Sequence, residues 1–147
     1  MNLDQRLVDA AIDQLDRRWP AAIEAVAAAL YLDGGDILTS VGFDNINAAA
    51  NLCAETGALC QAFTMNQRVT ASVCVQRDLS SNTIRVLAPC GICQERLAVW
   101  GPMVQVGTPS TSAAGWSMRT LAELHPYYWA ATYSDDGHWP AFSDHSD

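Results

Sequence analysis

Residues 53–55 read Cys-Ala-Glu and residues 89–93 read Pro-Cys-Gly-Ile-Cys, so these two stretches carry three thiols and one carboxylate between them. Three thiolates can hold a zinc ion and leave its fourth tetrahedral position open to a water, which distinguishes a catalytic zinc site from a closed structural one. The carboxylate of Glu55 follows the first thiol closely enough to move a proton of that water. We therefore expect a catalytic zinc site whose ligands are Cys53, Cys90 and Cys93.

Both stretches are predicted to begin helices. Residues 51–63 and 90–100 have helix-like apolar spacing, and Pro89 is well tolerated immediately before a helix. The three-residue offset between Cys90 and Cys93 returns the second sulfur to the same helical face. The N–H groups and the positive end of the dipole at a helix start stabilise thiolates, so two helices that begin side by side can share one metal ion.

The rest of the chain alternates strand and helix patterns, which is typical of an α/β fold. An amphipathic helix is predicted from Leu3 to Pro20 and a short helix over 119–124, with a loop over 107–115. The first two strands are predicted to form a hairpin about the turn residues 33–36. The predicted strands are 23–32, 37–41, 69–75, 83–87 and 103–107. We expect a single domain over 1–133 and an irregular or disordered tail over 134–147.

The composition limits what this domain can bind. At 147 residues and 50% hydrophobic content, the chain suits one compact domain with its own core. Its formal net charge is −8 with only eight Lys and Arg, so a phosphate backbone would be repelled and nucleic acid is not an expected partner. No stretch is apolar enough to span a membrane, and the amino terminus lacks the basic and apolar segments of a signal peptide. We expect a cytoplasmic protein that binds a small neutral or cationic molecule.

Two other interpretations of the cysteines are open. The CxxC at 90–93 could be a redox dithiol, as is common in a reducing compartment, but this would leave Cys53 and Glu55 without a role. A structural zinc would need a fourth ligand, for which Cys60 and Cys74 are available, although both are expected to be small core residues. The histidines are expected on the surface, and they are His125, His138 and His145.

The Cys-Ala-Glu and Pro-Cys-Gly-x-Cys segments resemble the zinc signature of the cytidine deaminase family, in the small-subunit branch that includes cytidine deaminases and blasticidin-S deaminases. The resemblance covers most of the chain. Three other parts match the family in order and spacing, namely the apolar strand 26–30 with the Asp-Gly turn after it, Leu97-Ala98 after the CxxC, and 124–126 near the end. Only the two zinc segments are highly specific.

The resemblance implies an α/β/α sandwich with helices on both faces of a mixed five-stranded sheet, assembled as a homotetramer or homodimer. It implies Zn²⁺ as the cofactor, held by the three cysteines named above. Glu55 would take a proton from the zinc-activated water, pass it to N3 of the pyrimidine and later protonate the departing amine, so that cytosine becomes uracil and ammonia leaves. The backbone N–H groups of Ala54 and Cys90 would contact the ring and the developing tetrahedral centre.

The chain departs from the family pattern where the substrate is recognised and where the thiolate charge is offset. The Asn-x-Glu that holds the ribose in nucleoside-specific members is replaced by Gly42 and Asp44, and Glu24 stands where an aromatic residue would stack on the base. Thr56 and Gln94 occupy positions that are Arg in many three-cysteine members, so other hydrogen bonds to the sulfurs must compensate.

The substrate-binding residues that the resemblance implies are Glu24, Asp44, Asn45, Ala54 and Trp129. Glu24 and Asp44 have two interpretations: carboxylates at strand edges that face solvent, or walls of an acidic pocket that favours a substrate with an amine or guanidine. Trp129 stands where the family places an aromatic residue that reaches the site, often of a neighbouring subunit. Packing at a subunit interface would explain the same placement.

The expected function is zinc-dependent hydrolytic deamination of the cytosine moiety of a nucleoside, as in pyrimidine salvage. One alternative is a blasticidin-S-type deaminase that acts on a nucleoside antibiotic. The other is a catalytically idle zinc-binding fold used for ligand binding or assembly, which the altered ribose clamp and the missing arginines make conceivable.

Overall fold

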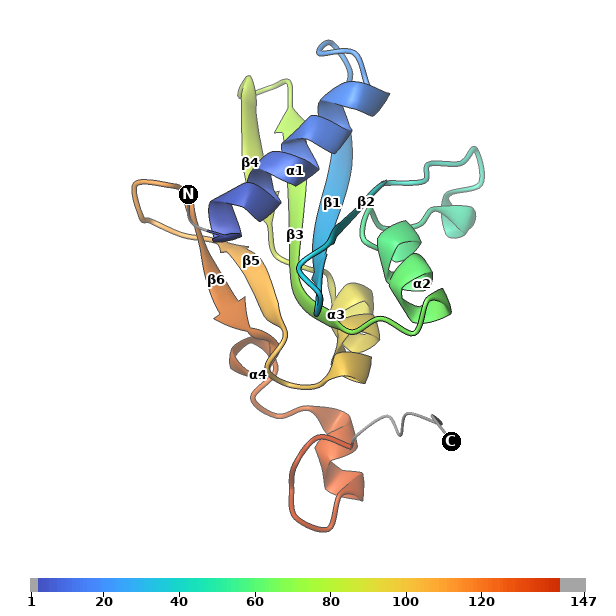
Figure 1. The fold of residues 1–147 in the computed structure, drawn as a ribbon. Helices are drawn as coiled ribbons and strands as arrows, with labels where there is room; N and C mark the ends of the chain where they lie inside the picture. Colours follow the sequence, from blue (N-terminus) through green and yellow to red (C-terminus); the bar gives the residue numbers. More distant parts are fainter. Residues whose placement is uncertain (1–2, 141–147) are drawn as a thin grey trace.

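A computed structural model describes residues 3–140 of the chain, and its strands form one mixed six-stranded sheet (Figure 1). The strand order is β2-β1-β3-β5-β6, and β4 pairs with the part of β3 beyond β5. The strands are β1 (Ala25–Leu32), β2 (Ile37–Val41), β3 (Val69–Asp78), β4 (Thr83–Leu87), β5 (Gln105–Pro109) and β6 (Trp116–Thr120). The helices are α1 (Leu3–Arg18), α2 (Thr56–Thr64), α3 (Gly91–Leu97) and α4 (Leu121–Leu124), with short 3-10 helices η1 (Ala48–Ala50), η2 (Ala98–Trp100) and η3 (Trp129–Tyr133).

The alternation of side chains along β1 builds a core on each face of the sheet. Tyr31 and its neighbours two residues apart on one face pack with Leu7 and Leu15 of α1. Leu30 and Leu32 on the opposite face pack with the buried sides of α2 and α3. Figure 1 shows α1 lying across one face of the sheet, with α2 and α3 on the other. The α/β class with helices on both faces, expected from the sequence, is confirmed.

The sheet has six strands where five were expected, because residues 116–120 form a strand that was not predicted. Residues 110–115 form the predicted loop, which is shorter than the expected 107–115 and is closed by a hydrogen bond from Ser110 N–H to the carbonyl of Gly115. The chain then returns along β5 as the antiparallel β6, and Trp116 and Met118 pack against the core beneath α1. The predicted helix over 119–124 is correspondingly shorter and begins only after Thr120, whose side chain caps it.

A row of small residues crosses the sheet where α2 and α3 begin. Ser40 of β2 pairs with Ala28 of β1, and Ala28 pairs with Cys74 of β3. Ala28 and Cys74 are buried against Ala54, in the turn that leads into α2. Since none of these side chains is larger than a thiol, the turn packs directly on the sheet. Cys74 of this row and Ala54 above it line the cavity of the functional site.

The carboxyl-terminal part of the described chain packs back on the domain. Gly137 adopts a positive φ of 71°, and the ring of Trp139 lies 4.2 Å from that of Tyr128, between centroids. The predicted division between a domain over 1–133 and a tail over 134–147 stays a prediction, and residues 141–147, which include His145, lie outside the described part. Among the helices of residues 3–140, none is both long enough and apolar enough to cross a bilayer.

Candidate active site

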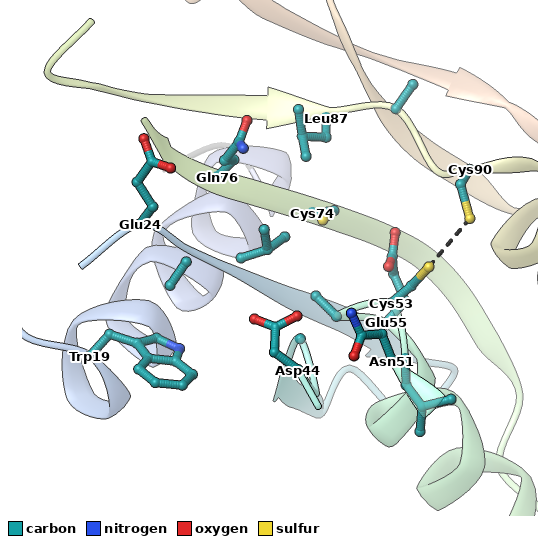
Figure 2. A pocket seen from close by; sticks show the side chains of 16 residues that line it. Trp19, Glu24, Asp44, Asn51, Cys53, Glu55, Cys74, Gln76, Leu87 and Cys90 are labelled. Carbon is teal, nitrogen blue, oxygen red and sulfur yellow. Dashed lines mark hydrogen bonds between the residues drawn. The ribbon is translucent and has the colours of Figure 1, made fainter. Parts of the chain in front are cut away.

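The sulfur atoms of Cys53 and Cys90 lie at one end of a cavity (Figure 2), and the sulfur atom of Cys93 lies close to them. All three lie within 4.8 Å of one another, and the sulfurs of Cys53 and Cys90 are 3.4 Å apart. Tetrahedral coordination with Zn–S bonds of about 2.3 Å places thiolate sulfurs about 3.8 Å apart. The observed separations bracket this value, so the three side chains fit a zinc ion. Within residues 3–140 the cluster contains three cysteines and no fourth ligand.

Two neighbouring helix starts bring these thiols together. Cys53 lies in the turn before α2, while Cys90 is the extended residue that precedes α3 and Cys93 lies in the first turn of that helix. Burial acts to raise the pKa of Cys90, but the N–H groups of Cys93 and Ile92 and the neighbouring thiols outweigh it, so the pKa is lowered overall. The helix start therefore favours a thiolate at position 90.

The other two thiols resist ionisation in the absence of a cation. Burial raises the pKa of Cys93, and the charges of Glu55 and Cys90 raise it further. The pKa of Cys53 is also raised, first by burial and then by the Cys90 thiol. A divalent cation coordinated by a thiol reverses this balance because it stabilises the deprotonated form. A bound divalent cation would therefore be needed for Cys53 and Cys93 to become thiolates.

Glu55 is a buried carboxylate beside the thiols. The residue is 3% exposed, and one carboxylate oxygen accepts a hydrogen bond from the Cys93 thiol at 3.4 Å. Glu55 precedes α2, but its side chain does not cap the helix. The carboxylate lines the cavity, where it can accept or deliver a proton close to the three sulfurs.

The cavity extends from the thiols to the end of α1 and has a volume of about 410 Å³. Figure 2 shows Glu55, Cys53 and Cys90 at one end of it and Trp19 and Glu24 at the other. We call these the thiol end and the far end. Three of the predicted substrate-binding residues line the cavity, namely Glu24, Asp44 and Ala54. Asn45 and Trp129 are not among the lining residues.

Asn45 lies just outside the cavity, in the loop between Phe43 and Leu52. These two residues pair with each other and close the base of the loop, which we call its neck. Phe43 and Leu52 form an isolated antiparallel bridge, with hydrogen bonds of 3.0 and 2.9 Å between their backbones. The N–H of Asn45 donates to the side chain of Asn51 at 2.6 Å, and Asn51 lines the cavity together with Asp44. The neck therefore presents Asp44 and Asn51 to the cavity.

The loop between α1 and β1 was recognised as part of the site from the sequence only through Glu24, and Trp19 was missed. It carries Trp19 and Glu24, and the buried guanidinium of Arg77 donates to the carbonyls of Pro20 and Ile23 at 2.8 and 3.1 Å. A second nitrogen of Arg77 is paired with Asp16 of α1 at 2.5 Å. The indole nitrogen of Trp19 is buried without a hydrogen-bond partner in the described structure. The position of Trp19 directly before Pro20 could have indicated this role. A helix ends before a proline, so the side chain at its end can pack against another part of the fold.

Trp129 lies on the outside of the domain, next to α3. It is 61% exposed, and its indole N–H donates to the carboxylate of Glu95 at 3.0 Å. The hydroxyl of Tyr128 donates to the other oxygen of Glu95 at 2.9 Å. Glu95 thus fixes this aromatic segment to the helix that carries two of the thiols.

The residues that stand at the family's arginine positions make contacts of their own. The hydroxyl of Thr56 accepts a hydrogen bond at 2.8 Å from the guanidinium of Arg96, which belongs to α3. Thr56 directly follows Glu55, so Arg96 brings a positive charge to the edge of the thiol end. The amide of Gln94 donates to the carbonyl of Pro89 at 2.8 Å. Gln94 therefore holds the loop before Cys90.

Comparisons with known proteins find cytidine deaminases among the similar structures. No protein-family profile matches the chain. The crystal structure of the cytidine deaminase from Bacillus anthracis superimposes with a TM-score of 0.84 and 40% sequence identity, over 92% of this chain and 96% of that one. That of the cytidine deaminase from Mycobacterium leprae gives a TM-score of 0.66 and 27% identity, over 86% and 98% of the two chains.

Curated relatives are more distant in sequence. A blasticidin-S deaminase from Bacillus cereus is 26% identical over 103 residues, covering 67% of this chain and 74% of the relative. A cytidine deaminase from Mycobacterium tuberculosis is 35% identical over 78 residues, covering 52% of this chain and 55% of the relative.

The fold and the cluster of three thiols beside a buried carboxylate define a hydrolytic deaminase of the zinc-dependent class. The 40% identity to a solved cytidine deaminase, over 96% of that chain, narrows the assignment from this class to one family. The chain belongs to the cytidine deaminase family. The resemblance noted in its two cysteine segments is confirmed.

Proposed function

We propose that the protein removes the exocyclic amine from the cytosine moiety of a nucleoside by hydrolysis, giving uracil and ammonia. The observation that carries this proposal is the Glu55 carboxylate, 3% exposed and 3.4 Å from the Cys93 sulfur, at the thiol end of a cavity of about 410 Å³. A cavity of this size can hold a small organic ligand.

Each group at the thiol end has a role in this reaction. Cys53, Cys90 and Cys93 would hold a zinc ion, which when bound acidifies a water to the point where it can attack carbon. The Glu55 carboxylate would take up the proton that the water loses and deliver it to N3 of the ring. It would then take the proton of the hydroxyl group newly formed on C4 and pass it to the amine, which leaves as ammonia. Ala54 lines the cavity at the thiol end, where we expect its backbone N–H to orient the ring.

The preferred test of this function is loss of the cytosine absorbance band on mixing the protein with cytidine and deoxycytidine. Glu55→Gln is the informative variant because it keeps the size of the side chain and removes its basicity. We expect turnover by the unmodified protein and its loss in the variant, with the zinc content unchanged. Turnover that survives Glu55→Gln would exclude the proposed mechanism. Absence of turnover on any cytosine compound would favour a zinc-binding fold without catalytic activity.

A second candidate function is favoured by the acidity of the far end. Glu24 lines the far end, Asp44 lines the cavity between the two ends (Figure 2), and no Lys or Arg is among the lining residues. A substrate that carries an amine or guanidine on its sugar, as an aminoacyl-nucleoside antibiotic does, would gain from these charges. Blasticidin S is therefore the third compound in the assay. The variants Glu24→Gln and Asp44→Asn should weaken its binding more than that of cytidine if this second function is correct.

Assembly is part of the proposal. Tyr127, Trp129 and Tyr133 are 95%, 61% and 78% exposed, which is a large aromatic area for a chain that stays a monomer. We propose a homotetramer or homodimer in which Trp129 approaches the cavity of a neighbouring subunit. Light scattering coupled to size-exclusion chromatography tests this, and a monomer at micromolar concentration would contradict it. A cytoplasmic location and a role in pyrimidine salvage complete the proposal.

A further inference from the structure

We propose that Ser40 is a positioning residue for Glu55 and supplies the cap that helix α2 lacks at its own start. The inference rests on the deaminase function proposed above, but it concerns a residue outside the cavity. Ser40 belongs to β2, and no residue of β2 lines the cavity. Its effect on the reaction must therefore pass through the backbone that it holds.

The start of α2 has an unusual need for a partner. The first N–H groups of an α-helix have no acceptor within the helix, and the residue before the helix commonly supplies a side-chain oxygen. In α2 that residue is Glu55, and its side chain makes no capping hydrogen bond. Its carboxylate lies against the Cys93 thiol instead. The functional site thus occupies the side chain that stands at the capping position.

Ser40 supplies the missing oxygen from the neighbouring strand. Its hydroxyl accepts a hydrogen bond at 3.0 Å from the N–H of Ala58, the third residue of α2. The same hydroxyl donates to the carbonyl of Ala54, the residue immediately before Glu55. One side chain therefore fixes the backbone on both sides of Glu55. Cys53 is one residue further away and shares this support.

The approach of β2 to α2 depends on a glycine. A Cβ built on Gly57 would lie 3.0 Å from the Cβ of Ser40 and 3.6 Å from its hydroxyl oxygen. Beneath the turn, Ala54 packs on Ala28, which is the cross-strand neighbour of Ser40. The hydroxyl reaches the helix only because position 57 carries no side chain. Ser40 and Gly57 are thus a matched pair.

The chain offers a close control for a substitution at Ser40. Thr39 is adjacent to it on β2, and its hydroxyl donates at 2.7 Å to Gln14 of α1. Thr39→Val therefore removes a partly buried hydroxyl from the same strand on the side away from Glu55. The experiment compares Ser40→Ala with Thr39→Val in three measurements: kcat and KM for cytidine, the rate of zinc loss to a chelator, and the melting temperature.

We expect Ser40→Ala to lower kcat on the order of tenfold to a hundredfold with a much smaller change in KM, because a misplaced base slows the chemical step more than it weakens binding. Zinc should also leave faster than from the unmodified protein. Thr39→Val should lower the melting temperature without changing kcat or zinc loss. A purely structural role for Ser40 would make the two variants alike, with only the melting temperature changed.

A double variant separates the hydroxyl from the volume of the side chain. Gly57→Ala alone should destabilise the protein, since its Cβ has no room beside Ser40. Ser40→Gly together with Gly57→Ala relieves that contact but contains no hydroxyl. We expect the double variant to recover the melting temperature and to keep the low kcat. Recovery of kcat as well would show that packing alone positions Glu55 and would overturn the proposal.

Failure of the proposal can be told apart from failure of the deaminase function. If the unmodified protein does not convert any cytosine compound, the proposed function is wrong, and the zinc measurement alone decides the role of Ser40. Equal rates of zinc loss from Ser40→Ala and Thr39→Val would then overturn it. If the unmodified protein is active, an unchanged kcat in Ser40→Ala overturns it directly.

Discussion

At the thiol end of the cavity, the functional groups come from two helix starts, whereas at the far end they come from loops and strands that are distant in sequence. Glu55 and the three cysteines occupy two short segments at helix starts, and the segment of Glu55 is also held by Ser40 of β2. Trp19, Glu24 and Asp44 depend on tertiary contacts, chiefly those of Arg77 and of the Phe43–Leu52 bridge. We infer that changes at the thiol end affect the reaction itself, while changes at the far end affect which substrate is bound.

The largest effect is expected for Cys90→Ala, which removes a thiol ligand from the start of α3. The variant should lose its zinc and lower kcat by more than about 10³-fold, since the metal supplies the nucleophile. Metal analysis by mass spectrometry and the absorbance assay measure both. Cys60→Ala is the control, because Cys60 is exposed on α2 outside the cluster. A Cys90→Ala protein that still binds one zinc ion tightly would show that Cys90 is not an essential ligand and would contradict the role assigned to the thiol end.

At the far end, Arg77→Met should act mainly on substrate binding. Loss of the guanidinium removes one hydrogen-bond donor from each of the carbonyls of Pro20 and Ile23, which should lower the free energy of unfolding by about 2 kcal/mol. The loop that carries Trp19 and Glu24 should loosen, so we expect KM to rise about tenfold with kcat within about threefold of the unmodified protein.

The matched control for Arg77→Met is Arg85→Met. The Arg85 side chain is 55% exposed and pairs with Asp78 at 3.0 Å. Steady-state kinetics and chemical denaturation of both variants test the prediction. A fall in kcat larger than the rise in KM for Arg77→Met would show that the far end is not separate from the chemistry.

A smaller effect is expected from Arg96→Met, at the edge of the thiol end. Its guanidinium donates to Thr56, next to Glu55, and groups that support a metal site indirectly change metal affinity by about tenfold or more. We expect zinc to be lost to a chelator about fivefold faster, with KM unchanged. Arg119→Met is the control, because Arg119 is exposed on β6 and pairs with Glu123 at 3.5 Å. Equal zinc loss from both variants would contradict the role of Arg96.

The smallest effect concerns Asp78, next to Arg77 at the end of β3. The hydroxyl of Ser80 is the main cause that lowers the pKa of Asp78 to about 2, with further contributions from Ser81 and Arg85. A carboxyl whose folded pKa is lowered stabilises the protein above its unfolded pKa, near 3.8, and this stability is lost as the pH falls toward 2. Urea denaturation between pH 5 and pH 2.5 should show a steeper loss in the unmodified protein than in Asp78→Asn. Parallel curves would contradict this.

The sequence predicted the thiol end well because its information is local. The spacing of Cys90 and Cys93 and the position of Glu55 after Cys53 are meaningful on any helix start, whatever the rest of the fold. Trp19 and Gln76 were missed because their place at the cavity depends on the register of β1 with β3 and on the contacts of Arg77.

The same division explains the one error in the fold. Residues 110–115 are rich in Ser, Thr and Gly, which favours a loop, and the sequence gives no local sign that the chain returns along β5. The pairing of Val106 with Arg119 and the packing of Trp116 beneath α1 decide in favour of a strand. Both are long-range contacts that a local pattern does not carry.

The closed neck formed by Phe43 and Leu52 has a consequence for how this enzyme can acquire new substrates. The bridge fixes the two ends of the loop, while the residues at its tip stand in solvent, with Ile46 fully exposed. Lengthening or shortening the tip therefore does not disturb the catalytic turn that follows Leu52. Asp44 and Asn51 stay at the cavity wall while the length of the tip changes. Loop grafting between relatives at this position is thus a direct route to altered selectivity with the hydrolytic machinery preserved.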